Sequence, residues 1–189
     1  MKTKLHIAVL VTTLVFLVGG LISYTLVKNG YFPIAKVNGQ IISYKTVVEN
    51  VDVSRRLYSQ GLAGSSAQLD QLFSRNNSPE LIKNSLENLI TNVVIKDASS
   101  AEVLAKAGQE VEANFKDAAN LASSVKSIYG WDVATFRERI LEPQALFQIL
   151  GQEKGRSFEN WVQAEKNKAK VSIWFLPYKW QNGQLENKK

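Results

Sequence analysis

The chain has 189 residues, a formal net charge of +6 and no cysteine. The lack of cysteine excludes disulfides, thiolate metal sites and cysteine nucleophiles. The single histidine, His6, lies in an N-terminal apolar run, so residues 28–189 offer no imidazole ligand for zinc and no histidine base. The length predicts one folded domain plus an anchor. We expect no metal, no cofactor and no catalytic residue.

The N-terminal segment from Leu5 to Val27 contains no Asp, Glu, Lys or Arg. As a helix it would be about 34 Å long, which is enough to cross a bilayer core. We therefore expect residues 1–27 to be an uncleaved signal-anchor with a single transmembrane helix; a cleaved signal peptide is the alternative. Lys2 and Lys4 precede the run, which favours a cytoplasmic N-terminus and an extracytoplasmic domain at the cell membrane.

The first strand is predicted by "IAKVNGQIIS", from Ile34 to Ser43, after a linker at 28–33. Asn38 and Gly39 supply the positive backbone φ angles of a tight turn. Ser43 can then cap a first helix over about residues 44–60, whose apolar residues recur at three- and four-residue spacing.

The second helix has a clear start, because Ser78 can cap it and Pro79 suits its first position. Its apolar stripe continues towards Ala107. We expect the break at Gly108, in preference to Ser99 and Ser100, and a third helix from about Gln109.

A fourth helix is predicted to begin after a cap at Asp132, to kink at Pro143 and to close at Gly151 and Gly155. Ser157 should cap a short helix after it. The last element is a strand at 171–176, which alternates apolar and other residues.

Only two strands are predicted, at 34–42 and 170–176. Because an isolated strand has no partner, the two should pair in one small sheet that closes a mainly helical domain from its two ends. The domain would span residues 34–176, and residues 177–189 would form a basic C-terminal tail.

The positive charge is concentrated near the C-terminus, where residues 154–189 hold eight Lys or Arg against three Asp or Glu. Nucleic-acid binding is one interpretation. A solvated basic face, or attraction to anionic lipid, is the simpler one, and we expect no nucleic-acid partner.

Four motifs in order resemble the SurA N-terminal domain family: "AKVNGQIIS" before an amphipathic helix, "LENLITNVVIKDAS" in a long central helix, "GQEVEANF" in the helix after it, and "YGWDVATFRERILEPQALFQIL". The strand at 171–176 is similar to the closing strand of that family. The resemblance covers residues 34–176. Isomerase members of the family carry a further parvulin domain, for which this chain has no spare segment, so isomerase activity is not implied.

The resemblance implies a chaperone of the bacterial envelope that assists protein folding by binding unfolded or extended exported polypeptides, held at the membrane through residues 5–27. The alternative is an assembly or scaffold subunit of the envelope that docks one folded partner. The candidate client-binding residues are apolar side chains near the connection between the first two helices: Tyr58, Leu62, Leu69, Leu72 and Phe73.

Overall fold

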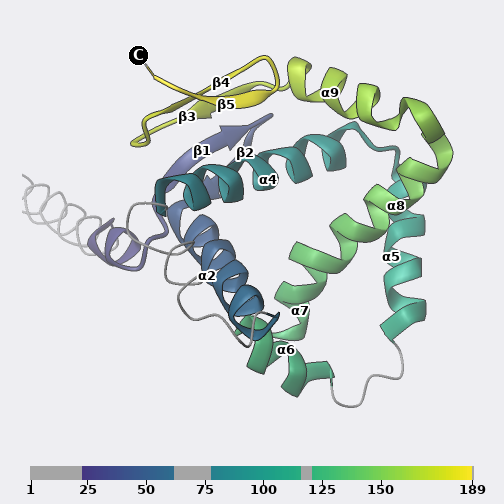
Figure 1. Cartoon of the computed structure of the whole chain (residues 1–189), viewed down its shortest axis with the longest axis horizontal. Coiled ribbons are helices and arrows are strands. Elements are labelled where there is room, and N and C mark those ends of the chain that lie inside the picture. The colour runs from purple at the N-terminus through teal and green to yellow at the C-terminus, as the bar shows by residue number, and fades with distance from the viewer. Residues whose placement is uncertain (1–22, 62–77, 116–120, 189) are drawn as a thin grey trace, which may run out of the picture.

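The computed structural model describes residues 23–61, 78–115 and 121–188. Helices make up most of the described chain, and the strands lie near its two ends (Figure 1). The helical elements are α2 (Tyr44–Gly61), α4 (Ser78–Ala98), α5 (Ala101–Phe115), α6 (Leu121–Tyr129), α7 (Val133–Phe136), the π turn η2 (Arg137–Leu141), α8 (Glu142–Lys154), the 3-10 turn η3 (Gly155–Ser157) and α9 (Phe158–Lys168). The strands are β1 (Pro33–Val37), β2 (Gln40–Ser43), β3 (Val171–Ile173), β4 (Tyr178–Gln181) and β5 (Gln184–Asn187).

The predicted pairing of the first strand with the strand after the last helix is confirmed. β1 pairs antiparallel with β3, and Ala35 lies opposite Ile173. The sheet has a third strand, because β2 folds back on β1 and gives the order β2-β1-β3. The turn between β1 and β2 is made by Asn38 and Gly39, with φ angles of 49° and 105°. The hydroxyl of Ser43 accepts a hydrogen bond from the Thr46 N–H, so the predicted cap of α2 is also present.

The residues after β3 do not form the basic tail that the sequence suggested. β4 and β5 make a second hairpin that packs on α4 (Figure 1). Tyr178 and Leu185 are buried in the core, and the Tyr178 hydroxyl donates to the carbonyl of Pro79 at 2.8 Å. Burial raises the pKa of this phenol, and the charge of Glu80 adds to the effect.

The expected helix break at Gly108 is wrong. The chain breaks at Ser99 and Ser100, and α5 runs through Gly108 without interruption. The Ser100 hydroxyl accepts from the Val103 N–H and so caps α5. A glycine costs an exposed helix only about 1 kcal/mol relative to alanine, whereas a serine cap satisfies a free N–H of a new helix.

The kink expected at Pro143 takes the form of the π turn η2 just before it. Proline has no N–H, and its ring collides with the carbonyl four residues earlier. In η2 the Glu142 N–H donates to Arg137, five residues back, which widens the helix at that point. α8 then continues through Gly151 to Lys154. The Ser157 hydroxyl donates to the Lys154 carbonyl and does not cap α9, contrary to expectation.

The described residues bury two apolar clusters. The sheet cluster joins β1, β2, α2, α4 and the C-terminal hairpin, and Ile34, Leu86 and Ile90 are fully buried in it. The helical cluster joins α5, α6, η2 and α8, with Trp131 and Leu150 among its members. α4 contributes to both clusters and connects the two halves of the domain.

The expected transmembrane segment, from residue 5 to 27, lies mostly outside the described residues, which begin at 23. Within the described part of the chain, no helix is long and apolar enough to cross a membrane. Residues 23–28 are helical. A turn at residues 29–30 closes this helix: Gly30 has a φ of 74°, and the Tyr31 N–H donates to the Leu26 carbonyl at 2.8 Å.

Candidate functional site

The client-binding residues expected from the sequence fall outside the part of the chain whose side chains the structure describes. Leu62, Leu69, Leu72 and Phe73 lie outside the described residues, in the stretch 62–77. Tyr58 lies in α2, but the structure describes only its backbone. Their role therefore stays a prediction, and the candidate site is built from two clefts among the described residues.

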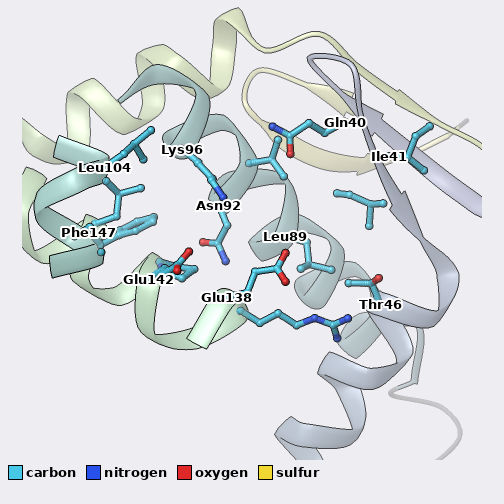
Figure 2. Close-up of a pocket in the computed structure, with 17 residues that line it drawn as sticks. Gln40, Ile41, Thr46, Leu89, Asn92, Lys96, Leu104, Glu138, Glu142 and Phe147 are labelled. Atoms are coloured by element: carbon cyan, nitrogen blue, oxygen red, sulfur yellow. The ribbon is translucent and has the colours of Figure 1, made fainter. Parts of the chain in front are cut away.

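The first cleft has a volume of about 380 Å³ and lies between β2, α4, α5 and the η2–α8 segment. Its apolar wall includes Leu89, Leu104 and Phe147. Figure 2 shows Asn92, Glu138 and Glu142 projecting between these apolar side chains from opposite sides of the cleft. A cavity with apolar walls and a few polar groups suits a ligand that combines apolar surface with hydrogen-bonding groups.

The second cleft is larger, about 820 Å³, and lies between α2, α4 and α8. Side-chain amides dominate its polar lining: Asn50 from α2, Asn84, Asn88 and Asn92 from α4, and Gln144 from α8. Asn84 and Asn88 are exposed to solvent. Within the described part of the chain, no side-chain hydrogen bond of these five amides is found. Each amide can therefore donate and accept with a ligand at the same time.

The two clefts adjoin, because Asn92, Arg139, Pro143 and Phe147 line both of them. Together they follow one face of α4, whose lining residues recur every three or four positions from Leu81 to Lys96. We call this combined surface the α4 groove. Fifteen residue steps of helix span about 22 Å, which matches six or seven residues of extended chain.

An ion pair lies where the two clefts meet. The Arg139 guanidinium, from η2, donates to Glu49 of α2 at 2.6 Å. It also lies over the ring of Trp131, at 5.1 Å from the centroid. Glu49 has a second cation nearby, since Lys45 lies 3.7 Å away. The pair ties α2 to the π turn and so limits how far the two sides of the groove can separate.

The charged side chains that line the groove balance, with two of each sign. Lys96 and Arg139 are opposed by Glu138 and Glu142. Glu142 accepts from Arg137, which also donates to Glu112. These two hydrogen bonds raise the pKa of the Arg137 guanidinium, and the bond to Glu112 has the larger effect. A lining without net charge favours a ligand without strong charge.

Metal chemistry finds no support in this geometry. Within the described ranges there is no group of three or more His, Asp or Glu side chains that could hold a metal ion. Two acidic side chains at the groove are paired with arginines, Glu49 with Arg139 and Glu142 with Arg137.

We call Asn84, Asn88 and Asn92 of α4 the amide row; it is the site feature that the sequence analysis missed. Asn84, Asn88 and Asn92 stand at intervals of four in the printed sequence, so they must share one face of a helix. The apolar stripe of the same helix indicates only its buried face. The four-residue repeat of asparagine was the available signal.

These features define a mainly helical domain closed by strands from its two ends, with a groove along its central helix. The chain belongs to the SurA-like N-terminal domain family, whose model matches residues 1–126. This confirms the resemblance drawn from the sequence, and the relationship is to a chaperone family. No curated protein and no solved structure gave a significant match.

Proposed function

We propose that this protein is a membrane-anchored, extracytoplasmic chaperone-like module that binds unfolded or extended polypeptides and catalyses no reaction. The observation that carries the proposal is the α4 groove. Its amide row can pair with peptide N–H and carbonyl groups of any sequence, and its apolar wall can shelter apolar side chains.

The amide row suits an extended chain for a geometric reason. Asn84, Asn88 and Asn92 follow one another at about 6 Å along the helix axis, since four residues rise 1.5 Å each. Alternate residues of an extended strand are about 6.6 Å apart, so successive amides meet every second peptide unit. A folded partner would present few such unpaired backbone groups.

Membrane attachment through residues 5–27 is part of the same proposal. The support is the uncharged 23-residue run and the family match, which begins at residue 1 and so includes this run. A tether at the export face would raise the effective concentration of the groove near emerging chains.

The experiment uses the full chain reconstituted in lipid nanodiscs. Light scattering follows the aggregation of an unfolded model protein, and fluorescence anisotropy follows the binding of labelled extended peptides of unrelated sequence. We expect slower aggregation and binding of several peptides, without faster isomerisation of a prolyl peptide. Empty nanodiscs provide the control.

Binding of many peptides with similar affinity would separate this function from the assembly-subunit alternative. One folded protein recovered in fixed stoichiometry, with no protection of the model substrate, would favour the alternative. Prolyl isomerisation well above the uncatalysed rate would contradict the absence of catalysis.

A further inference from the structure

An apolar surface is exposed at the end of the molecule where the described chain begins. Of the described residues, five large hydrophobic side chains at this end are at least 47% exposed: Tyr24, Leu26, Val27, Tyr31 and Phe175. The first four belong to residues 23–31, and Phe175 lies in the turn between β3 and β4. Phe32 joins the two segments, since its ring lies 6.4 Å from that of Phe175 in an edge-on contact. We call these six residues the aromatic end.

Phe175 is the most unusual member of this surface. Its side chain is 82% exposed, and its backbone φ is 59°. The other non-glycine residues with positive φ in the described chain are Asn38 and Asn182, each followed by glycine in a hairpin turn. A bulky residue in the left-handed region costs about 1 kcal/mol or more. The fold therefore holds a strained phenylalanine out into solvent, which points to a use for the side chain outside the fold.

The segment that carries the other residues is fastened to the domain. The Lys45 N–H, at the start of α2, donates to the Gly30 carbonyl at 2.8 Å. The Lys45 ammonium also donates to the Tyr31 hydroxyl and lies 4.2 Å from the centre of that ring. The Phe32 and Tyr44 rings stack at 5.1 Å. These contacts hold residues 30–32 against the start of α2.

The charges around the aromatic end favour a lipid surface as its partner. Residues 23–36 and 170–180 contain no Asp or Glu, and Lys28 lies in the first of these segments. Two further lysines contact the aromatic end: Lys45 lies over the Tyr31 ring, and the Lys188 ammonium donates to the carbonyl of Leu176 at 3.0 Å, next to Phe175. In the sequence, the uncharged run of residues 5–22 immediately precedes residue 23. Aromatic rings beside lysines are the side chains that settle at the membrane–water interface, where anionic lipids attract the cations.

We infer that the aromatic end rests in the interfacial layer of the membrane, with Phe175 inserted among the lipid headgroups. This inference rests on the anchoring included in the proposed function and adds a second contact to it. The two contacts together, the run and Phe175, would fix the tilt of the domain. α5 lies on the side away from the aromatic end (Figure 1), so it would face away from the bilayer.

Site-specific labelling tests this inference. Because the chain has no cysteine, a single introduced cysteine carries the only label. The full chain with Phe175→Cys or Ser172→Cys is labelled with an environment-sensitive fluorophore and reconstituted in phosphatidylcholine vesicles, with and without phosphatidylglycerol. Gln109→Cys, exposed on α5, is the matched control. Vesicle flotation after alkaline extraction reports anchoring, and spin-labelled lipids report depth through quenching.

We expect both labels near the aromatic end to be quenched, more strongly with the anionic lipid, and the label at 109 to stay in water. Adding Phe175→Asp to Ser172→Cys should remove most of the quenching. A chain that fails to float overturns the anchoring and this inference with it. A chain that floats with an unquenched label at 175 overturns this inference alone. Quenching at 175 that an excess of unfolded polypeptide abolishes would also overturn it, and would make the aromatic end a client surface.

Discussion

Arg139 and Glu49 are joined at 2.6 Å although 90 positions separate them in the sequence. Arg139 belongs to the helical half of the domain and Glu49 to the helix that leaves the sheet, so the ion pair connects the two halves beside the α4 groove. Both side chains are partly buried, with 23% and 30% of their surface exposed. Water therefore screens this pair less than it screens an ion pair on the open surface.

Arg139→Gln and Glu49→Gln should each lower the free energy of unfolding by about 1 kcal/mol. This value is the upper end of the range measured for ion pairs on protein surfaces. A double-mutant cycle, measured by urea unfolding, separates their interaction from the loss of the Trp131 contact. We expect a coupling energy of about 0.5–1 kcal/mol. Independent effects of the two substitutions would show that the pair does not hold the halves together.

Removing an amide of this row should leave the stability of the domain unchanged or higher and should lower its affinity for peptides. Alanine favours helix more than asparagine does, so Asn84→Ala and Asn88→Ala should leave stability unchanged or raise it by a few tenths of a kcal/mol. Each change removes a hydrogen-bonding group from the groove. At about 0.5–1.5 kcal/mol per lost hydrogen bond, peptide affinity should fall by about two- to tenfold for each.

Asn114→Ala is the matched control for these variants. Asn114 is exposed on α5 and does not line the α4 groove. It should gain the same helical preference with no loss of peptide affinity. Equal peptide affinity in the three variants would show that the amide row does not bind the client.

Much of the fold could be predicted because its signals are local. The Asn38–Gly39 turn, the cap at Ser43 and the cap at Asp132 each depend on a few neighbouring residues, and all three are present. The pairing of β1 with β3 followed from a simple requirement, that two lone strands need each other.

The parts that could not be predicted depend on distant contacts. Gly108 looks like a helix break in the sequence, but the neighbouring Ala107 and Val111 pack into the helical cluster and hold α5 continuous. The C-terminal hairpin looks like a basic tail because its inward residues, Tyr178 and Leu185, are few. Its partner surface on α4 is almost 100 positions away, as the bond from Tyr178 to Pro79 shows.

Leu185→Ala tests whether the hairpin belongs to the core. Leu185 is 2% exposed in the sheet cluster, and its N–H approaches the Glu87 carboxylate at 3.4 Å. Removing a buried leucine side chain leaves a cavity and should cost about 2–5 kcal/mol in the free energy of unfolding. Gln184→Ala, at an exposed position of the same strand, should change it by less than about 0.5 kcal/mol. Equal denaturation midpoints for the two variants would contradict the packing.

Acid should weaken the domain partly through Asp132. Its carboxylate accepts a hydrogen bond from the Thr135 N–H at 2.7 Å, and this bond lowers the carboxyl pKa below its ordinary value of 3.8. A lowered pKa in the folded state contributes stability above the unfolded pKa, and this contribution is lost as the pH falls through the folded pKa. Asp132→Asn keeps an acceptor that does not titrate. Thermal unfolding between pH 6 and pH 2 should therefore depend less on pH in the variant. An unchanged pH profile would show that the cap does not titrate as the geometry requires.

Phe175→Asn tests whether the Phe175 side chain contributes to the stability of the fold. Asparagine tolerates a positive φ, so the change should relieve backbone strain, while it loses only the edge contact with Phe32. The thermal midpoint of the full chain in nanodiscs should stay the same or rise.

Phe32→Ala is the contrasting variant, because Phe32 is half-buried, stacks on Tyr44 and packs against the sheet cluster. It should lower the midpoint, since truncating a packed aromatic ring costs a few kcal/mol. A large drop with Phe175→Asn would mean that Phe175 stabilises the turn itself. A stable variant would leave contact with a partner outside the fold as the reason for a strained, exposed phenylalanine.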